Sequence, residues 1–157
     1  MSESTETGAA VRVPPPLVFI LGALASWGLH SVAPLGLPLP PAAVAAITAV
    51  SGVVGLSFLS ITQLGFMKTK QDPRPWKPTP SIMDTGIYAW SRNPMYIGMA
   101  AVELAIGAWV GTAWILLAVP LCLWIVYTTA VRHEEAYLLE TFGEEYADYM
   151  RRVRRWI

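Results

Sequence analysis

Two long stretches almost free of charged side chains most strongly limit what this chain can fold into. No Asp, Glu, Lys or Arg occurs in residues 13–67, and Glu103 is the one charged residue in residues 93–131. Each stretch is long enough for two bilayer crossings at about 20 residues apiece. The sequence therefore predicts an all-α polytopic membrane protein with four transmembrane helices.

The positions of the 11 Lys and Arg residues predict how these helices are oriented. They fall in the N-terminal tail, in residues 68–92 and after Val131, whereas the connections around residues 34–41 and Gly111 carry none. Cytoplasmic loops of membrane proteins are enriched in Lys and Arg. Both termini and the central loop are therefore expected on the cytoplasmic side, which requires an even number of spans.

A single membrane domain is expected over residues 1–157. Residues 1–13 are expected to form a disordered tail, and residues 17–66 two packing helices. Residues 67–91 are expected to form a cytoplasmic loop, and residues 92–157 a catalytic hairpin with a C-terminal helix. Small residues such as Gly52 and Gly55 on the second helix would allow close helix packing and would permit a homodimer.

The first apolar segment has an alternative interpretation as a secretory signal peptide. Arg12 precedes it, and residues 23–25 (Ala-Leu-Ala) resemble a cleavage site. Because the hydrophobicity continues to Val32, a retained helix is favoured.

The loop at residues 68–91 contains Pro73, Pro75, Pro78 and Pro80, which keep most of it from forming a helix. A proline-rich loop of this length is a spacer or a lid. Its position directly before Arg92 favours a lid.

A first polar cluster lies at residues 92–98 (Arg-Asn-Pro-Met-Tyr-Ile-Gly), where the loop ends and an apolar helix begins. Pro94 suits the first turn of a helix, and Tyr96 would lie at headgroup depth. The same residues would also serve as an ordinary helix start with a basic flank.

A second polar cluster, Arg132-His133-Glu134-Glu135, lies at the other end of the hairpin that Pro94 opens. The hairpin turns within about two residues at Gly111, so its helices must pack antiparallel. The two clusters, with Tyr88, are thereby brought together, which favours a functional site over an ordinary helix start.

An amphipathic helix is predicted after Val131 and is expected to lie on the bilayer. Its apolar stripe is formed by Leu138, Phe142, Tyr146, Tyr149 and Val153. The basic residues at its end are expected to meet anionic headgroups; these are Arg151, Arg152, Arg154 and Arg155.

Three polar residues are expected within the membrane. Glu103 falls near mid-membrane, where it would either line a substrate tunnel or be a neutral acid hydrogen-bonded to another helix. His30 has no partner at metal-ligand spacing and is interpreted as structural, and Cys122 as a packing residue. No metal site and no nucleic-acid interface are expected.

The two clusters together carry a resemblance to a known family. Arg-Asn-Pro-x-Tyr-x-Gly is followed by an apolar hairpin and by Glu-Glu-x-x-Leu-x-x-x-Phe-Gly-x-x-Tyr-x-x-Tyr-x-x-x-Val-x-Arg. This pattern, over residues 86–156, resembles the isoprenylcysteine carboxyl methyltransferase and phospholipid methyltransferase superfamily.

The resemblance implies an integral membrane enzyme, of a bacterial inner membrane, that uses S-adenosylmethionine on a lipophilic or lipid-modified acceptor. The acceptor it implies is a carboxylate such as isoprenylcysteine or a lipid headgroup. Cofactor contacts would come from Arg92, Asn93, Pro94, Tyr96 and Gly98, and the polar segment after the hairpin would supply Arg132, Glu134 and Glu135.

The residue types suit this chemistry. Glu134 or Glu135 can hold the amino group of the cofactor, and Arg92 or Arg132 can hold its carboxylate. The rings of Tyr88, Tyr96 and Tyr146 can face the adenine or the sulfonium. The expected catalytic residues are Glu135, Arg132 and Glu134, with Glu135 as a base if the acceptor is an amine.

Two other functions are considered. A membrane reductase of the sterol-reductase type shares the interfacial Pro-x-Tyr-x-Gly arrangement but would use NADPH, and an acidic residue commonly follows the Gly in that family, where Met99 stands here. A small transporter or scaffold would use Glu103 as its coupling group, although the polar residues gather at one interface rather than at the midplane.

Overall fold

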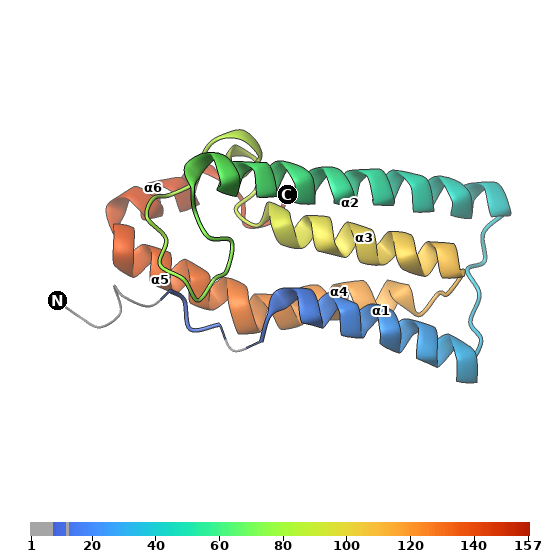
Figure 1. The fold of residues 1–157 in the computed structure, drawn as a ribbon. Coiled ribbons are helices and arrows are strands. Elements are labelled where there is room, and N and C mark those ends of the chain that lie inside the picture. Colours follow the sequence, from blue (N-terminus) through green and yellow to red (C-terminus); the bar gives the residue numbers. More distant parts are fainter. Residues whose placement is uncertain (1–7, 12) are drawn as a thin grey trace.

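The computed structural model describes residues 8–11 and 13–157, and this part of the chain is helical without a named strand (Figure 1). The elements are α1 (Pro15–Val32), α2 (Pro41–Thr69), the 3₁₀ turn η2 (Gly86–Ala89), α3 (Pro94–Val110), α4 (Ile115–Val126), the π-helical turn η3 (Tyr127–Val131), α5 (Arg132–Phe142) and α6 (Glu144–Arg152). The all-α prediction is confirmed.

Among the described residues, three helices are long and apolar enough to cross a membrane. They are Pro15–Val32, Pro41–Thr69 and the continuous helix Ile115–Phe142. The apolar helix α3 is shorter, with 17 residues. These lengths and compositions are those of an integral membrane protein.

Proline begins three of these helices. Pro15, Pro41 and Pro94 each stand in the first turn, where the missing N–H group would have had no helical partner. Figure 1 shows α2 alongside α3 and α1 alongside α4, and the two pairs are in contact through α1 and α3. The loop after α2 lies at the end of the molecule where α5 and α6 are found.

The contact between α2 and α3 is made through glycine. A Cβ atom on Gly55 would lie 2.8 Å from the carbonyl oxygen of Gly98 and 2.7 Å from a methyl carbon of Val102. The small residues of α2 that the sequence offered for a homodimer therefore face α3 of the same chain.

The segment after the hairpin differs from the single amphipathic helix that was expected. Two helices, α5 and α6, meet at Gly143, whose φ of 56° and ψ of −125° are adopted readily only by glycine. The predicted apolar stripe still converges across this break, because Tyr146, Tyr149 and Val153 form a buried cluster with Leu138 and Phe142 packed against it.

Part of the expected disordered tail lies outside the described residues, namely residues 1–7 and 12. Within the tail, Gly8 and Ala9 pack against the proline-rich loop. Their N–H groups donate to the carbonyl oxygens of Trp76 and Pro75, at 3.2 and 2.7 Å. Ala9 is buried by this contact.

Glu103 is buried in the helix bundle and is 2% exposed. Its Oε1 atom accepts a hydrogen bond from the Cys122 thiol at 3.4 Å, and a Cβ atom on Gly22 of α1 would lie 2.3 Å from it. Glu103 therefore lies where α1, α3 and α4 meet, a position that suits a hydrogen-bonded acid between helices.

Replacing Glu103 with Gln is expected to leave the midpoint of thermal unfolding within about 5 °C of that of the parent protein, because Gln keeps the shape and a neutral acceptor for Cys122. Calorimetry on purified protein would check this. Glu103→Lys is the contrasting variant, since an ammonium at this depth should prevent folding. A large fall in the unfolding midpoint of Glu103→Gln would mean that the carboxylic acid itself is needed where α1, α3 and α4 meet.

Candidate functional site

A cavity lined by both polar and apolar residues opens between the loop after α2, the start of α3, and helices α5 and α6. Its empty space, with the open mouth included, is about 830 Å³. Among the residues that line it are Phe66, Gln71, Asp72, Thr79, Ser81, Tyr88, Arg92, Asn93, Pro94, Tyr96, Glu134, Tyr137, Tyr146 and Tyr149.

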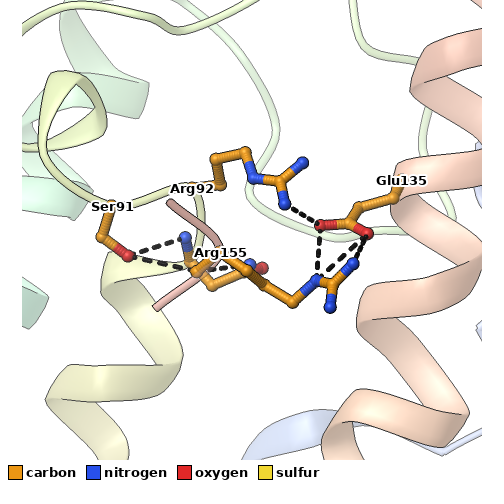
Figure 2. A network of polar contacts seen from close by, with 5 residues as sticks. Ser91, Arg92, Glu135 and Arg155 are labelled. Carbon is orange, nitrogen blue, oxygen red and sulfur yellow. Dashed lines mark hydrogen bonds and ion pairs between the residues drawn. The ribbon is translucent and has the colours of Figure 1, made fainter. Parts of the chain in front are cut away.

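A carboxylate shared by two arginines lies beside this cavity. The Nε and Nη2 atoms of Arg155 donate to both oxygens of Glu135, at 3.0, 3.2 and 2.9 Å. Nη2 of Arg92 reaches Oε1 of the same carboxylate at 3.2 Å. Figure 2 shows Glu135 between the two guanidinium groups, with one nitrogen of Arg92 directed at it and the others pointing away.

The contact with Glu135 leaves hydrogen-bond donors of Arg92 unpaired among the described residues. Its side chain is 7% exposed, yet its Nε and Nη1 atoms are buried without a hydrogen-bond partner among the described residues. Buried polar groups are nearly always paired in folded proteins. Because Arg92 also lines the cavity, these donors could hold an anionic group bound there.

The segment that carries Arg92 is fixed by backbone groups from the residues after α6. The Arg92 N–H donates to the carbonyl oxygen of Arg154 at 3.0 Å. The Asn93 amide and the Ser91 hydroxyl both donate to the carbonyl oxygen of Arg155, at 3.0 and 3.4 Å (Figure 2). Residues 91–93 therefore have little freedom to move.

Glu134 and Tyr96 form the second polar contact at the cavity. The Tyr96 hydroxyl donates to Oε1 of Glu134 at 2.5 Å, which is short because the acceptor is a carboxylate. One oxygen of Glu134 is thus taken, and the other is open to an additional donor in the cavity.

Three further tyrosines supply neutral rings and hydroxyls. Burial raises the pKa of Tyr146 to about 12, although the neighbouring Arg92 guanidinium acts in the opposite direction, and burial also raises the pKa values of Tyr88 and Tyr149. The Tyr149 hydroxyl donates to the carbonyl oxygen of Tyr88 at 2.7 Å. All three remain hydrogen-bond donors at neutral pH.

Most of the residues singled out in the sequence come together here. Seven of them line the cavity: Tyr88, Arg92, Asn93, Pro94, Tyr96, Glu134 and Tyr146. Glu135 lies behind Arg92 rather than on the lining, and Arg132 is exposed. Gly98 packs against α2, as described above.

Arg155 was interpreted from the sequence as an anchor for lipid headgroups, and the structure corrects this. Its guanidinium binds Glu135, which raises the pKa of Arg155, and the side chain is about one-third exposed. Two other arginines of the predicted anchor also form ion pairs: Arg151 with Glu144 and Asp148, and Arg152 with Asp84. Arg155 is the Arg that ends the sequence pattern quoted above, and this was the signal in the sequence that set it apart from the other arginines.

A second cavity is almost entirely apolar and lies between α3, α4 and the last residues of the chain. It is lined by Ile97, Ala100, Leu123, Trp124, Tyr127, Trp156 and Ile157. The guanidinium carbon of Arg155 lies 5.0 Å from the centre of the Tyr127 ring. This apolar groove therefore borders the polar network around Glu135.

Residues 42–145, which run from α2 to the start of α6, match the family described as phospholipid methyltransferase. Curated proteins are similar over shorter stretches. Protein-S-isoprenylcysteine O-methyltransferase of Mus musculus is 33% identical over 82 residues, which cover 48% of this chain and 26% of that protein. The Saccharomyces cerevisiae protein of that name is 34% identical over 79 residues, 46% of this chain and 30% of that protein.

The chain thus spans less than a third of the length of these curated relatives. An uncharacterized protein of Haemophilus influenzae is matched over its whole length, at 33% identity over 63 residues and 40% of this chain. No solved structure matches the chain.

Proposed function

The chain belongs to the phospholipid methyltransferase family, and from this premise we propose that it is an integral membrane methyltransferase that uses S-adenosylmethionine. The observation that carries the proposal is the buried Arg92, which keeps two unpaired donor nitrogens, in the described structure, beside a cavity lined by Glu134 and several tyrosines. An anionic group bound in the cavity would satisfy these donors.

The residues around the cavity fit the functional groups of S-adenosylmethionine. Arg92 would hold the carboxylate, because a planar guanidinium suits carboxylate geometry. Glu134 would accept a hydrogen bond from the amino group, and the rings of Tyr88 and Tyr146 would face the sulfonium or the adenine. When bound, the cofactor would supply an electrophilic methyl group.

The contribution of the protein to methyl transfer would be positioning and the exclusion of water. The loop after α2 suits a lid for this purpose. The Thr79 N–H donates to the Tyr137 hydroxyl at 3.2 Å, and the Gln71 amide donates to the Ser81 hydroxyl at 2.9 Å. The first contact connects the loop to α5, and the second is a contact within the loop. All four residues line the cavity.

The acceptor in this proposal is a lipophilic molecule that enters from the bilayer along the apolar groove. A carboxylate such as that of an isoprenylcysteine is favoured over a lipid headgroup amine. A carboxylate acceptor needs no general base, and Glu135, the base considered for an amine, has both oxygens paired with Arg155. The names of the curated relatives agree with an O-methylated acceptor.

We further propose four spans, with both termini and the cavity on the cytoplasmic side of a bacterial inner membrane. With 17 residues, α3 is about 25 Å long, which is slightly shorter than the roughly 30 Å hydrocarbon core and at the lower limit of length for a spanning helix. The basic loop, α5 and α6 lie at one end of the bundle, in agreement with the distribution of Lys and Arg (Figure 1). The amphipathic pair α5 and α6 would cover the cavity at the interface.

Binding of S-adenosylmethionine and S-adenosylhomocysteine to the protein in lipid nanodiscs, measured by calorimetry, tests the proposed function. Saturable binding of both at one site per chain is expected. Folded protein that binds neither would refute the proposal, and NADPH would then be the next compound to titrate.

Glu134→Gln is expected to weaken binding of S-adenosylhomocysteine by about tenfold or more, because the amide cannot offer a charged acceptor to the amino group. Calorimetry on the variant would measure the change. The matched control is Glu145→Gln, an equal change on the exposed surface of α6, which should bind as the parent does. Equal affinity of the two variants would remove Glu134 from the amino-group site.

A further inference from the structure

Glu135 is shared unequally between its two arginines. Arg155 uses two nitrogens and reaches both carboxylate oxygens, with its shortest contact at 2.9 Å, whereas Arg92 uses one nitrogen at 3.2 Å. The carboxylate is therefore mainly the partner of Arg155. The guanidinium that lines the cavity, Arg92, is the less neutralised of the two.

The cluster of Arg92, Glu135 and Arg155 carries an excess of positive charge on the side of the cavity. Two guanidinium groups share one carboxylate, and the Nε and Nη1 atoms of Arg92 have no acceptor in the described part of the chain. An Arg and a carboxylate left alone together form a fork of two parallel hydrogen bonds. The presence of Arg155 is what opposes such a fork between Arg92 and Glu135.

We propose that Arg155 is a positioning residue, which occupies Glu135 so that Arg92 keeps its free N–H groups for a carboxylate ligand. The inference rests on the proposed function, because the ligand in question is the amino-acid carboxylate of the cofactor. Without Arg155, Glu135 turns to Arg92 and pairs with the donors that the ligand needs. Glu135 then competes with the carboxylate of the ligand for Arg92.

The location of Arg155 supports this role over that of a surface charge. Its backbone carbonyl holds Asn93 and Ser91, and its side chain lies over the Tyr127 ring. One residue thus fixes both the backbone beside Arg92 and the carboxylate that Arg92 touches. These contacts use the backbone oxygen of Arg155 and not its side chain, so the guanidinium can be tested separately from the backbone.

The test compares two ligands that differ in the amino-acid group. S-adenosylhomocysteine carries the carboxylate, and 5′-methylthioadenosine lacks it. In the Arg155→Gln protein in nanodiscs, the Kd of S-adenosylhomocysteine is expected to rise at least about tenfold, with that of 5′-methylthioadenosine unchanged within about twofold. Arg155→Lys, which keeps a charge but not the fork, should give an intermediate value.

A double-mutant cycle separates this role from a purely structural one. In the Glu135→Gln background no carboxylate is left to turn toward Arg92, so adding Arg155→Gln should cause no further loss of S-adenosylhomocysteine affinity. Additive losses would overturn the inference, as would equal weakening of both ligands by Arg155→Gln.

The binding measurements also distinguish failure of the proposed function from failure of this inference. A parent protein that binds neither ligand overturns the proposed function together with this inference. A parent protein that binds S-adenosylhomocysteine, with unchanged binding in Arg155→Gln, overturns the inference alone.

Discussion

Arg92→Ala is expected to raise the Kd of S-adenosylhomocysteine roughly 100-fold, the largest loss of binding among the variants considered. Hydrogen bonds to charged groups each contribute about 1.5–3 kcal/mol, and Arg92 has two free donor nitrogens at the cavity. Two such bonds at the lower value give about 3 kcal/mol, which corresponds to a change in Kd of roughly 100-fold. Calorimetry on the protein in nanodiscs would measure it.

The fold should survive this change because Glu135 keeps a partner. Arg155 already donates to both of its oxygens, so removal of Arg92 does not leave a buried carboxylate unpaired. Thermal unfolding followed by circular dichroism should therefore show a midpoint near that of the parent. A large fall in that midpoint would mean that Arg92 stabilises the cluster rather than serving the cavity.

Arg132→Ala is the matched control for Arg92→Ala. Both residues were expected from the sequence to hold a carboxylate, but Arg132 is exposed and lies off the cavity lining among the described residues. Its variant should bind S-adenosylhomocysteine within about twofold of the parent. If Arg132→Ala lost binding and Arg92→Ala kept it, the carboxylate site would have to be moved to the start of α5.

The helices were predictable because their signals are local. The uncharged stretches and the prolines of the first turns predicted α1, α2 and α3 close to their observed bounds. The short turn at Gly111 predicted that Tyr96 and Glu134 lie near each other. The break at Gly143 was missed because the apolar stripe runs through it with helical spacing. Only the backbone angles of that glycine reveal the change of direction.

The contact between Arg155 and Glu135 was missed for a different reason. It joins residues 20 positions apart in the chain across the end of α6, and it depends on backbone bonds to residues 91–93, more than 60 positions away. A row of basic residues after an amphipathic helix has the composition of a headgroup anchor. Nothing in that composition distinguishes the one arginine that turns inward.

Gly55→Leu is expected to lower the stability of the helix bundle strongly. A Cβ atom at this position would already lie 2.8 Å from the Gly98 carbonyl oxygen and from the Val102 amide nitrogen. These are backbone atoms, so α2 and α3 must move apart to make room. Overpacking typically costs about 1–3 kcal/mol and occasionally more, and at this backbone contact we expect an unfolding midpoint lower by roughly 10 °C.

The consequence should reach the cavity, because α2 and the loop after it carry Phe66 and Gln71 of the lining. Gly55→Leu should therefore also weaken S-adenosylhomocysteine binding in whatever fraction remains folded. Gly28→Leu is the matched control, since a Cβ atom on Gly28 meets nothing within 4 Å among the described residues. If the two variants had the same unfolding midpoint and the same Kd for S-adenosylhomocysteine, the close approach of α2 and α3 would not be what stabilises the cavity.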